Sequence, residues 1–134
     1  MHIRRILWKE TMPLRHQVLW SDKKIEYCYV EGDETAWHYG VFELDQIVSV
    51  ASVFLEYKSV RLRKFATAKK YQGKGIGTVV IKHIINELKS KGFTEFWCDA
   101  RESAIGFYQR FDMRVDGEKF FKGHIPYFKM SLKI

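Results

Sequence analysis

A loop with three glycines is the part of this chain whose residue types point most directly to chemistry. It reads Gln72-Gly73-Lys74-Gly75-Ile76-Gly77-Thr78 and lies between a strand-like segment and a helical one. Glycine lets the backbone approach a ligand closely and adopt positive φ angles. The following helix would offer free N–H groups and the positive end of its dipole, and Lys74 adds a positive charge. The loop therefore predicts a site for a compact anion such as a pyrophosphate.

Two better-known phosphate-binding loops do not fit these residues. A P-loop would have a Lys-Ser or Lys-Thr pair after its last glycine, and none follows Gly77. The dinucleotide-binding fingerprint has another glycine spacing and follows the first strand of its unit, whereas this loop follows the fourth predicted strand. A tight turn that binds nothing is the remaining alternative.

The elements on both sides of the loop predict a β-α-β crossover. Residues 60–67 combine apolar with charged side chains and are predicted to form a strand. After the loop, apolar residues recur at helical spacing until Gly92, and residues 93–98 form a second apolar strand. Two strands joined through a helix run parallel, with the helix packed on the sheet.

The rest of the chain predicts hairpins on both sides of this crossover. Strands are expected at 3–8, 36–43, 47–56, 113–119 and 127–133, with a helix capped by Thr11 and a short helix at 103–111. The fold class is therefore α+β, one domain over 1–134, with a central mixed, mostly antiparallel sheet flanked by helices.

The net charge of +7 and the pI of about 9.4 favour an anionic partner. The basic residues are spread along the chain, and their densest groups, 61–64 and 69–74, flank one strand and one loop. Aromatic residues do not alternate with these groups as a base-stacking surface would require. A compact anionic ligand is therefore expected, and no nucleic acid.

Composition excludes several other classes. No apolar run reaches the roughly 20 residues of a transmembrane helix, and charges interrupt the N-terminus, so a cytoplasmic protein without membrane contact is expected. Cys28 and Cys98 lie far apart in apolar segments, which predicts neither a disulfide nor a metal site.

Three segments together resemble the GNAT superfamily of acetyltransferases. Gln72-Gly73-Lys74-Gly75-Ile76-Gly77 is similar to the family's acetyl-CoA pyrophosphate signature, Phe65-Ala66-Thr67 to its fourth strand, and residues 104–111 to its tyrosine-containing helix. Further resemblance at 14–19, 38–40 and 125–127 is to the ElaA-like branch. The sequence departs from the family at Arg101, where Asn is frequent, and at Asp112-Met113, where Gly-Phe is favoured.

The resemblance implies acetyl-CoA as co-substrate, and no metal is expected. We expect the parallel strands 60–67 and 93–99 to be splayed, with the pantetheine arm between them, because the loop must feed its ligand toward the C-terminal ends of these strands. The strand residues Phe65, Ala66 and Thr67 would bind that arm through their backbone. The pyrophosphate would be bound by the loop residues Gln72, Gly73, Lys74, Gly75, Ile76, Gly77 and Thr78. Tyr108 would be the general acid that protonates the departing thiolate, and a backbone N–H near Thr67 would stabilise the oxyanion.

The general base and the acceptor stay open at this point. Carboxylates and one histidine are candidate bases, and a water relay is the alternative: Glu26, Glu31, Asp33, His38, Glu56 and Asp99. The acceptor would be a small-molecule or peptide amine. Candidate contacts to it are Arg15, Trp20, Trp37, Tyr39 and Tyr127. A homodimer is left open, and a catalytically inactive CoA-binding or sensing domain is the alternative function.

Overall fold

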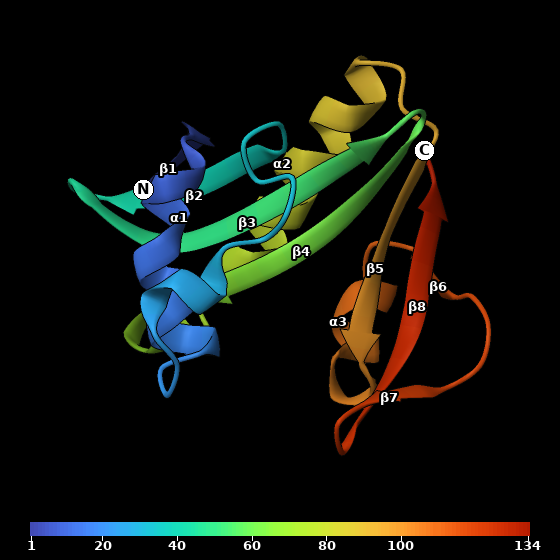
Figure 1. Ribbon diagram of the computed structural model, residues 1–134. Helices are drawn as coiled ribbons and strands as arrows, with labels where there is room; N and C mark the ends of the chain where they lie inside the picture. Colours follow the sequence, from blue (N-terminus) through green and yellow to red (C-terminus); the bar gives the residue numbers. More distant parts are fainter.

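A computed structural model describes all 134 residues as one α+β domain built on an eight-stranded sheet (Figure 1). The strands are β1 (His2–Ile6), β2 (Trp37–Glu43), β3 (Gln46–Glu56), β4 (Ser59–Thr67), β5 (Glu95–Arg101), β6 (Arg114–Val115), β7 (Phe120–Lys122) and β8 (Ile125–Lys133). The helices are α1 (Trp8–Leu14), the π-helical η1 (Arg15–Leu19), the 3-10 turns η2 (Ile25–Cys28), η3 (Lys69–Tyr71) and η4 (Glu102–Ala104), α2 (Ile76–Ser90) and α3 (Ile105–Gln109).

The sheet has the strand order β1-β2-β3-β4-β5-β8-β6, with β7 paired to β8. Every pair is antiparallel except β4–β5, which is parallel and is connected through α2. The predicted fold class and the predicted crossover are therefore confirmed. Figure 1 shows the two halves of the sheet close together near the C-terminus and diverging toward the other end.

The divergence begins where the pairing of β4 with β5 stops. The register runs only from Ser59↔Glu95 to Arg61↔Trp97, although both strands continue for several residues. A bulge in β4 accompanies it, because two residues, Lys64 and Phe65, oppose the single residue Ala51 of β3. Lys64 has a φ of 53°, and a bulge of this kind bends its strand away from the neighbouring one. The predicted splay is confirmed.

The main core lies between α2 and the sheet. Apolar side chains of α2 at helical spacing are buried there, among them Val80, Ile84 and Leu88, each with 0% exposure. Burying a side chain of this size stabilises the fold by roughly 1.5–3 kcal/mol. A smaller cluster on the opposite face joins Leu14 of α1 to Val50 and Ala66. None of the helices combines the length and the apolar character that a membrane span requires.

Two local predictions were wrong. The first helix begins at Trp8 instead of being capped by Thr11, and the Glu10 carboxylate accepts a hydrogen bond of 2.9 Å from the N–H of Leu7. Thr11 lies inside the helix, where its hydroxyl donates to the carbonyl of Trp8 at 2.6 Å. Of the strand expected at 113–119, only Arg114–Val115 forms a strand (β6), and β7 begins after that range, at Phe120.

Candidate functional site

The glycine loop and the N-terminus of α2 enclose a cavity of about 360 Å³. Its lining includes most of the loop residues that the sequence singled out: Thr67, Gln72, Gly73, Gly75, Ile76, Gly77 and Thr78. Tyr71, Phe107 and Arg110 complete the wall. The first N–H groups of a helix have no intrahelical partner, and no acidic residue stands in the first turn of α2. The cavity is therefore suited to a negatively charged group.

The three loop glycines have different reasons to be glycine. Gly73 and Gly75 have φ angles of 72° and 82°, and a Cβ on either would meet nothing within 4 Å. Glycine is needed there for its backbone conformation, and the space in front of the loop is free. A Cβ on Gly77 would lie 3.3 Å from ring atoms of Phe65 and Phe107. Gly77 therefore permits close packing of two aromatic side chains.

Hydrogen bonds connect the loop to the end of β4. The Gln72 side-chain amide donates to the carbonyl of Thr67 at 2.9 Å, and the Thr67 hydroxyl lies 2.8 Å from that of Ser49. Three of the residues predicted to bind the co-substrate are not part of this cavity's wall, and one of them, Phe65, lines a second cavity described below. Ala66 is buried against the α1 side of the sheet, and Lys74 is exposed above the Tyr71 ring.

A second cavity, of about 680 Å³, lies in the opening between β4 and β5. It is lined by Leu19, Trp20, Leu62, Arg63, Lys64, Phe65, Cys98, Asp99, Ala100, Arg101, Ala104, Tyr108, Lys122, Gly123, Ile125 and Tyr127. We call this cavity the cleft. Tyr108, Trp20 and Tyr127, which the sequence placed near the reaction, all line the cleft. No residue lines both cavities, but Phe65 and Thr67, two positions apart on β4, line one each.

Tyr108 projects from α3 into the cleft beside the Cys98 thiol. Burial, followed by the neighbouring thiol, raises the pKa of the Tyr108 phenol above its ordinary value. Burial likewise raises the pKa of Cys98 to about 12. Both groups are therefore protonated at neutral pH, so Tyr108 can donate a hydrogen bond and Cys98 is not a thiolate nucleophile.

Asp99 is the one candidate base that lines the cleft, and it is already paired. Its Oδ2 atom lies 2.8 Å from Nη2 of Arg61 and 3.4 Å from Nζ of Lys122. Glu56 lines a different cavity, at the end of β3 where β4 and β5 are still paired. Glu26 and Glu31 are exposed and contribute nothing to the cleft wall.

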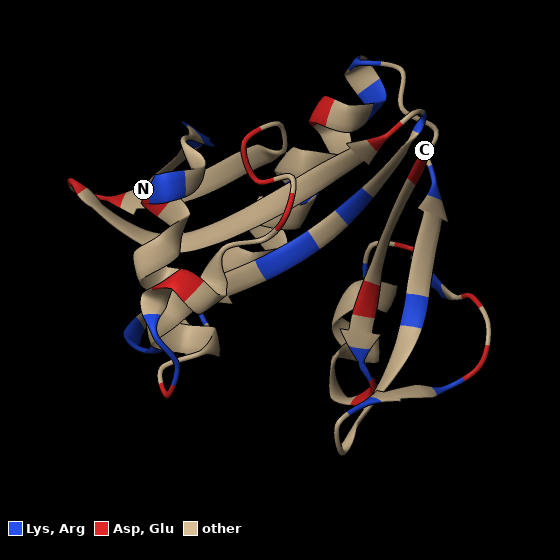
Figure 2. Cartoon of the chain, in the orientation of Figure 1, with Lys and Arg blue, Asp and Glu red and all other residues tan.

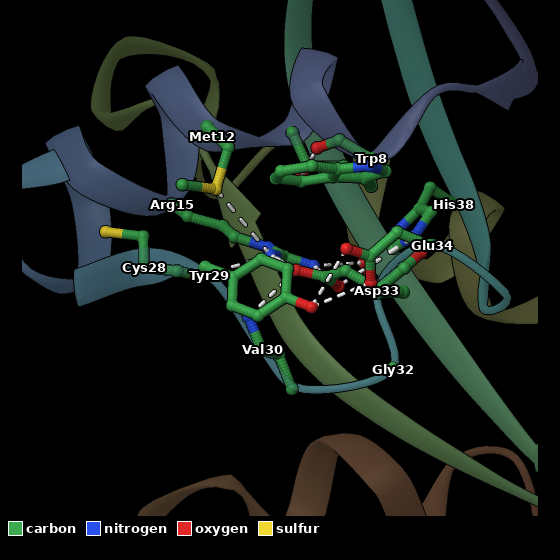
Figure 3. Close-up of polar contacts among 12 residues, drawn as sticks. Trp8, Met12, Arg15, Cys28, Tyr29, Val30, Gly32, Asp33, Glu34 and His38 are labelled. Atoms are coloured by element: carbon green, nitrogen blue, oxygen red, sulfur yellow. Dashed lines mark hydrogen bonds and ion pairs between the residues drawn. The ribbon is translucent and has the colours of Figure 1, made fainter. Parts of the chain in front are cut away.

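Two further candidate bases and one candidate acceptor contact form a buried structural cluster (Figure 3). Arg15, with 0% exposure, donates to both carboxylate oxygens of Asp33, at 2.7 and 2.9 Å, and to the Ser52 hydroxyl at 2.9 Å. His38 Nε2 donates to the backbone carbonyl of Asp33 at 2.8 Å, and its Nδ1 atom lies 2.7 Å from the Ser52 hydroxyl. The hypothesis that Arg15 binds an acceptor carboxylate is wrong, because its guanidinium is sealed from solvent.

Comparison with known proteins agrees with this geometry. A family model described as "Acetyltransferase (GNAT) domain" matches residues 21–134. The chain belongs to the GNAT acetyltransferases. It is 30% identical to the uncharacterized N-acetyltransferase YitI of Bacillus subtilis (strain 168). The aligned region is 129 residues long and covers 90% of this chain and 87% of that protein. The resemblance identified from the sequence is confirmed.

Solved structures show the same fold. Escherichia coli ElaA superposes with a TM-score of 0.82 at 14% identity, covering 97% of each chain. An aminoglycoside 6'-N-acetyltransferase complexed with coenzyme A has the same TM-score at 12% identity, covering 99% of this chain and 97% of that one. At these identities the likeness concerns the GNAT fold.

The remaining aromatic candidates of this GNAT domain lie on the opposite face of the sheet. The Tyr39 hydroxyl donates to the Glu87 carboxylate of α2, and Trp37 packs under the Arg5 guanidinium at 4.4 Å. Both belong to the region of the main core and not to the cleft. Strand alternation could have indicated this, because Trp37 and Tyr39 share a face with Val41, which is buried in that core.

Sequence reasoning missed several lining residues of this GNAT domain. Tyr71 and Arg110 line the loop cavity, and each lies within two residues of a residue that the sequence did single out. Arg63, Arg101 and Lys122 line the cleft, although they are far apart in the sequence. Only the crossover and the bulge bring these charges together, so no local pattern could have predicted it.

Proposed function

We propose that this chain transfers an acetyl group from acetyl-CoA to a primary amine. The observation that carries the proposal is the succession of two cavities along β4. An anion-binding loop at the start of α2 lies at the end of this strand, and the splayed cleft that contains Tyr108 opens beside it. The coenzyme A bound to the structurally similar aminoglycoside 6'-N-acetyltransferase supports the same assignment.

The residues present fit the parts of this co-substrate. The backbone N–H groups near Gly73 and Gly75 and the positive end of α2 would hold the pyrophosphate, and the Arg110 guanidinium lines the same cavity. Beyond Arg61, the edge of β4 that faces β5 has no strand partner. The backbone of Phe65, Ala66 and Thr67 would bind the pantetheine amides there, as a strand partner would.

Acetyl-CoA supplies a thioester carbonyl for the amine to attack and a thiolate to depart. The Tyr108 hydroxyl would donate its proton to that sulfur, and a backbone N–H of β4 near Thr67 would stabilise the carbonyl oxygen. Cys98 would not carry the acetyl group, because burial raises the pKa of its thiol to about 12. We therefore propose direct attack by the amine on the bound thioester.

Deprotonation of the amine does not require a carboxylate in this cleft. Asp99 is the only acidic side chain in the cleft wall, and its carboxylate already forms ion pairs with Arg61 and Lys122. Neighbouring positive charges disfavour a bound ammonium and so lower its pKa. The amine would enter as its neutral form or lose its proton to water.

Release of free thiol tests the proposal. The protein is mixed with acetyl-CoA and a panel of primary amines, while free coenzyme A is followed by a thiol reagent and acetylated amine by mass spectrometry. We expect thiol and product to appear in equal amounts with at least one amine. Saturable binding of acetyl-CoA without any product would contradict acetyl transfer and would favour the alternative function of a CoA-binding or sensing domain.

A further inference from the structure

The cleft contains basic side chains that form no ion pair within the protein. Arg63 and Lys64 on β4 and Arg101 at the end of β5 line it, and none of the three forms an ion pair. Lys122 lines it as well and shares Asp99 with Arg61. Figure 2 shows these basic segments on β4 on one side of the opening and around the ends of β5 and β7 on the other.

Two of these charges are partly withdrawn from water. Arg63 and Lys64 are half-buried, and burial is the main cause that lowers the pKa of both groups. The next cause is repulsion, from Arg61 on Arg63 and from Arg63 on Lys64. Asp33 and Asp99 act in the opposite direction on Arg63, but the pKa of Arg63 stays lowered. Half-buried charges of one sign that are only partly compensated destabilise a fold. An anion in the cleft would remove this repulsion.

The phosphates of the co-substrate do not account for the charge. They have their own site at the glycine loop, and that cavity shares no lining residue with the cleft. An anionic group that neutralises Arg63 and Arg101 would therefore belong to the second substrate.

The remaining wall of the cleft is apolar. The apolar lining residues come from three sides of the cleft. They are Leu19 and Trp20 at η1, Phe65 on β4, and Ile125 and Tyr127 on β8. Ten of the sixteen lining residues are hydrophobic, so the acceptor that shares the cleft with the pantetheine arm also needs apolar surface.

We infer that the acceptor is a small primary amine with an apolar body and an acidic group, a carboxylate or a phosphate, that pairs with Arg63 and Arg101. This inference rests on the proposed acetyl transfer and names its substrate class. Guanidinium groups bind carboxylates and phosphates through charge-assisted hydrogen bonds. Polycationic amines such as polyamines and aminoglycosides are excluded as preferred acceptors, because like charges would meet in a partly desolvated cleft.

Matched amines test the charge requirement. L-Phenylalanine is compared with L-phenylalaninamide and 2-phenylethylamine, and 2-aminoethyl phosphate with ethanolamine, with spermidine as the polycation. We expect kcat/KM for the better acid-bearing amine to exceed that of its neutral or cationic partner by at least roughly 10-fold. The two sets of amines also distinguish a carboxylate from a phosphate.

Charge-removing variants locate the recognition. Arg63→Gln and Arg101→Gln should each lower kcat/KM for the acid-bearing amine by roughly 10- to 100-fold and leave the neutral partner within about 3-fold. Lys82→Gln is the matched control. Lys82 is exposed on α2 and does not line the cleft, so this substitution removes one positive charge elsewhere on the protein. Arg101 is exposed, so its variant keeps the test valid if Arg63→Gln fails to fold.

The outcomes separate the two proposals. If kcat/KM for L-phenylalaninamide, 2-phenylethylamine, ethanolamine or spermidine equals or exceeds that for the acid-bearing amines, the proposed acidic acceptor is overturned. Acetyl transfer itself would remain supported. An unchanged preference in both Arg variants would overturn the assignment of the anion to these residues. Failure of every amine to release thiol would overturn the proposed function and, with it, the acceptor class.

Discussion

Tyr108 and Cys98 occupy one partly dry environment, and this affects the chemistry of both. A phenol in water has a pKa near 10, and burial in the cleft raises that of Tyr108. A buried phenol is therefore a weaker acid. The raised pKa of Cys98, about 12, indicates that a thiolate in the same cleft is also a stronger base than in water. The two shifts have the same sign, so they act in opposite directions on proton transfer from Tyr108 to a departing thiolate.

Replacing Tyr108 with Phe removes the proton and keeps the ring. We expect kcat to fall by roughly 10- to 1,000-fold while acetyl-CoA affinity changes little, because the hydroxyl acts on the leaving group. Steady-state kinetics and calorimetry measure the two effects. Tyr57→Phe is the control, since Tyr57 is 90% exposed between β3 and β4. Wild-type kcat in a folded Tyr108→Phe protein would show that another group protonates the thiolate.

Asp33 illustrates how a candidate base can be a structural group. Its carboxylate accepts hydrogen bonds from both terminal nitrogens of Arg15 and from the N–H of Val30 at 2.8 Å. Every member of this arrangement is buried, so it orders η1 and the following loop against β3 without access to a substrate.

Asp33→Asn should therefore reduce stability and leave catalysis intact. Removing one partner of a buried ion pair leaves an uncompensated charge, which costs roughly 3–5 kcal/mol. Urea unfolding of the variant measures this loss, and Glu31→Gln, an exposed carboxylate two residues away, should change little. If Asp33 were instead the general base, kcat of the folded variant would fall by orders of magnitude at near-normal stability.

The sequence predicted the residues of the loop better than those of the cluster. The loop lies in one continuous segment, and its glycine spacing directly indicates its backbone conformation. Arg15, by contrast, meets Asp33 and Ser52 from 18 and 37 positions away, and nothing near Arg15 distinguishes it from a surface arginine. Asp33 and His38 could not be recognised as members of this cluster for the same reason, because side-chain burial depends on the packing of distant elements.

At the scale of elements, α2 connects the anion site to the core. Its buried side places Ile84 and Leu88 against the sheet, which fixes the direction of its axis. Gly75 begins the helix and Gly92 follows it, and both are left-handed, with φ angles of 82° and 85°. These two glycines have the same backbone conformation but only Gly75 faces a cavity.

Gly75→Val and Gly92→Val therefore separate strain from binding. Both variants should lose roughly 1–2 kcal/mol of stability, because an L-residue is strained in this conformation. Only Gly75→Val places a side chain in front of the first N–H groups of α2, so we expect its acetyl-CoA Kd to rise by roughly 10-fold or more. Calorimetry measures both proteins. Equal Kd values for the two variants would remove the loop from the binding site.

The crossover was predictable as an element, whereas the bulge was not. Apolar periodicity and Gly92 define α2 in the sequence, and a helix between two strands implies a parallel pair. Lys64 has a positive φ without being glycine, asparagine or aspartate, so its residue type gives no signal. The same limit explains why the sequence did not group Lys64 with Arg101 around the cleft.

In the whole molecule, a hydrogen-bonded histidine joins the N-terminal helices to the sheet. The partners of His38 assign a neutral ring, because Nε2–H donates to the carbonyl of Asp33 and Nδ1 accepts from the Ser52 hydroxyl. The Ser52 oxygen in turn accepts from Arg15. Protonating the ring would place a second proton between His38 and Ser52 and a positive charge near Arg15.

The stability of the whole domain should therefore fall just below pH 6.5. Burial is the first cause that lowers the pKa of His38 below 6.5, while contacts to Asp33 oppose the shift and Arg15 and Arg5 add to it. Below pH 6.5 the unfolded chain takes up a proton that the folded chain refuses, so the free energy of unfolding decreases as the pH falls. The contribution of His38 to the free energy of unfolding is complete above pH 6.5 and is lost toward the folded-state pKa, with a slope of up to about 1.4 kcal/mol per pH unit.

Urea unfolding at closely spaced pH values measures this slope. His38→Gln should flatten it, whereas His124→Gln, at an exposed turn, should leave it in place. A slope that survives in His38→Gln would show that another group titrates on unfolding.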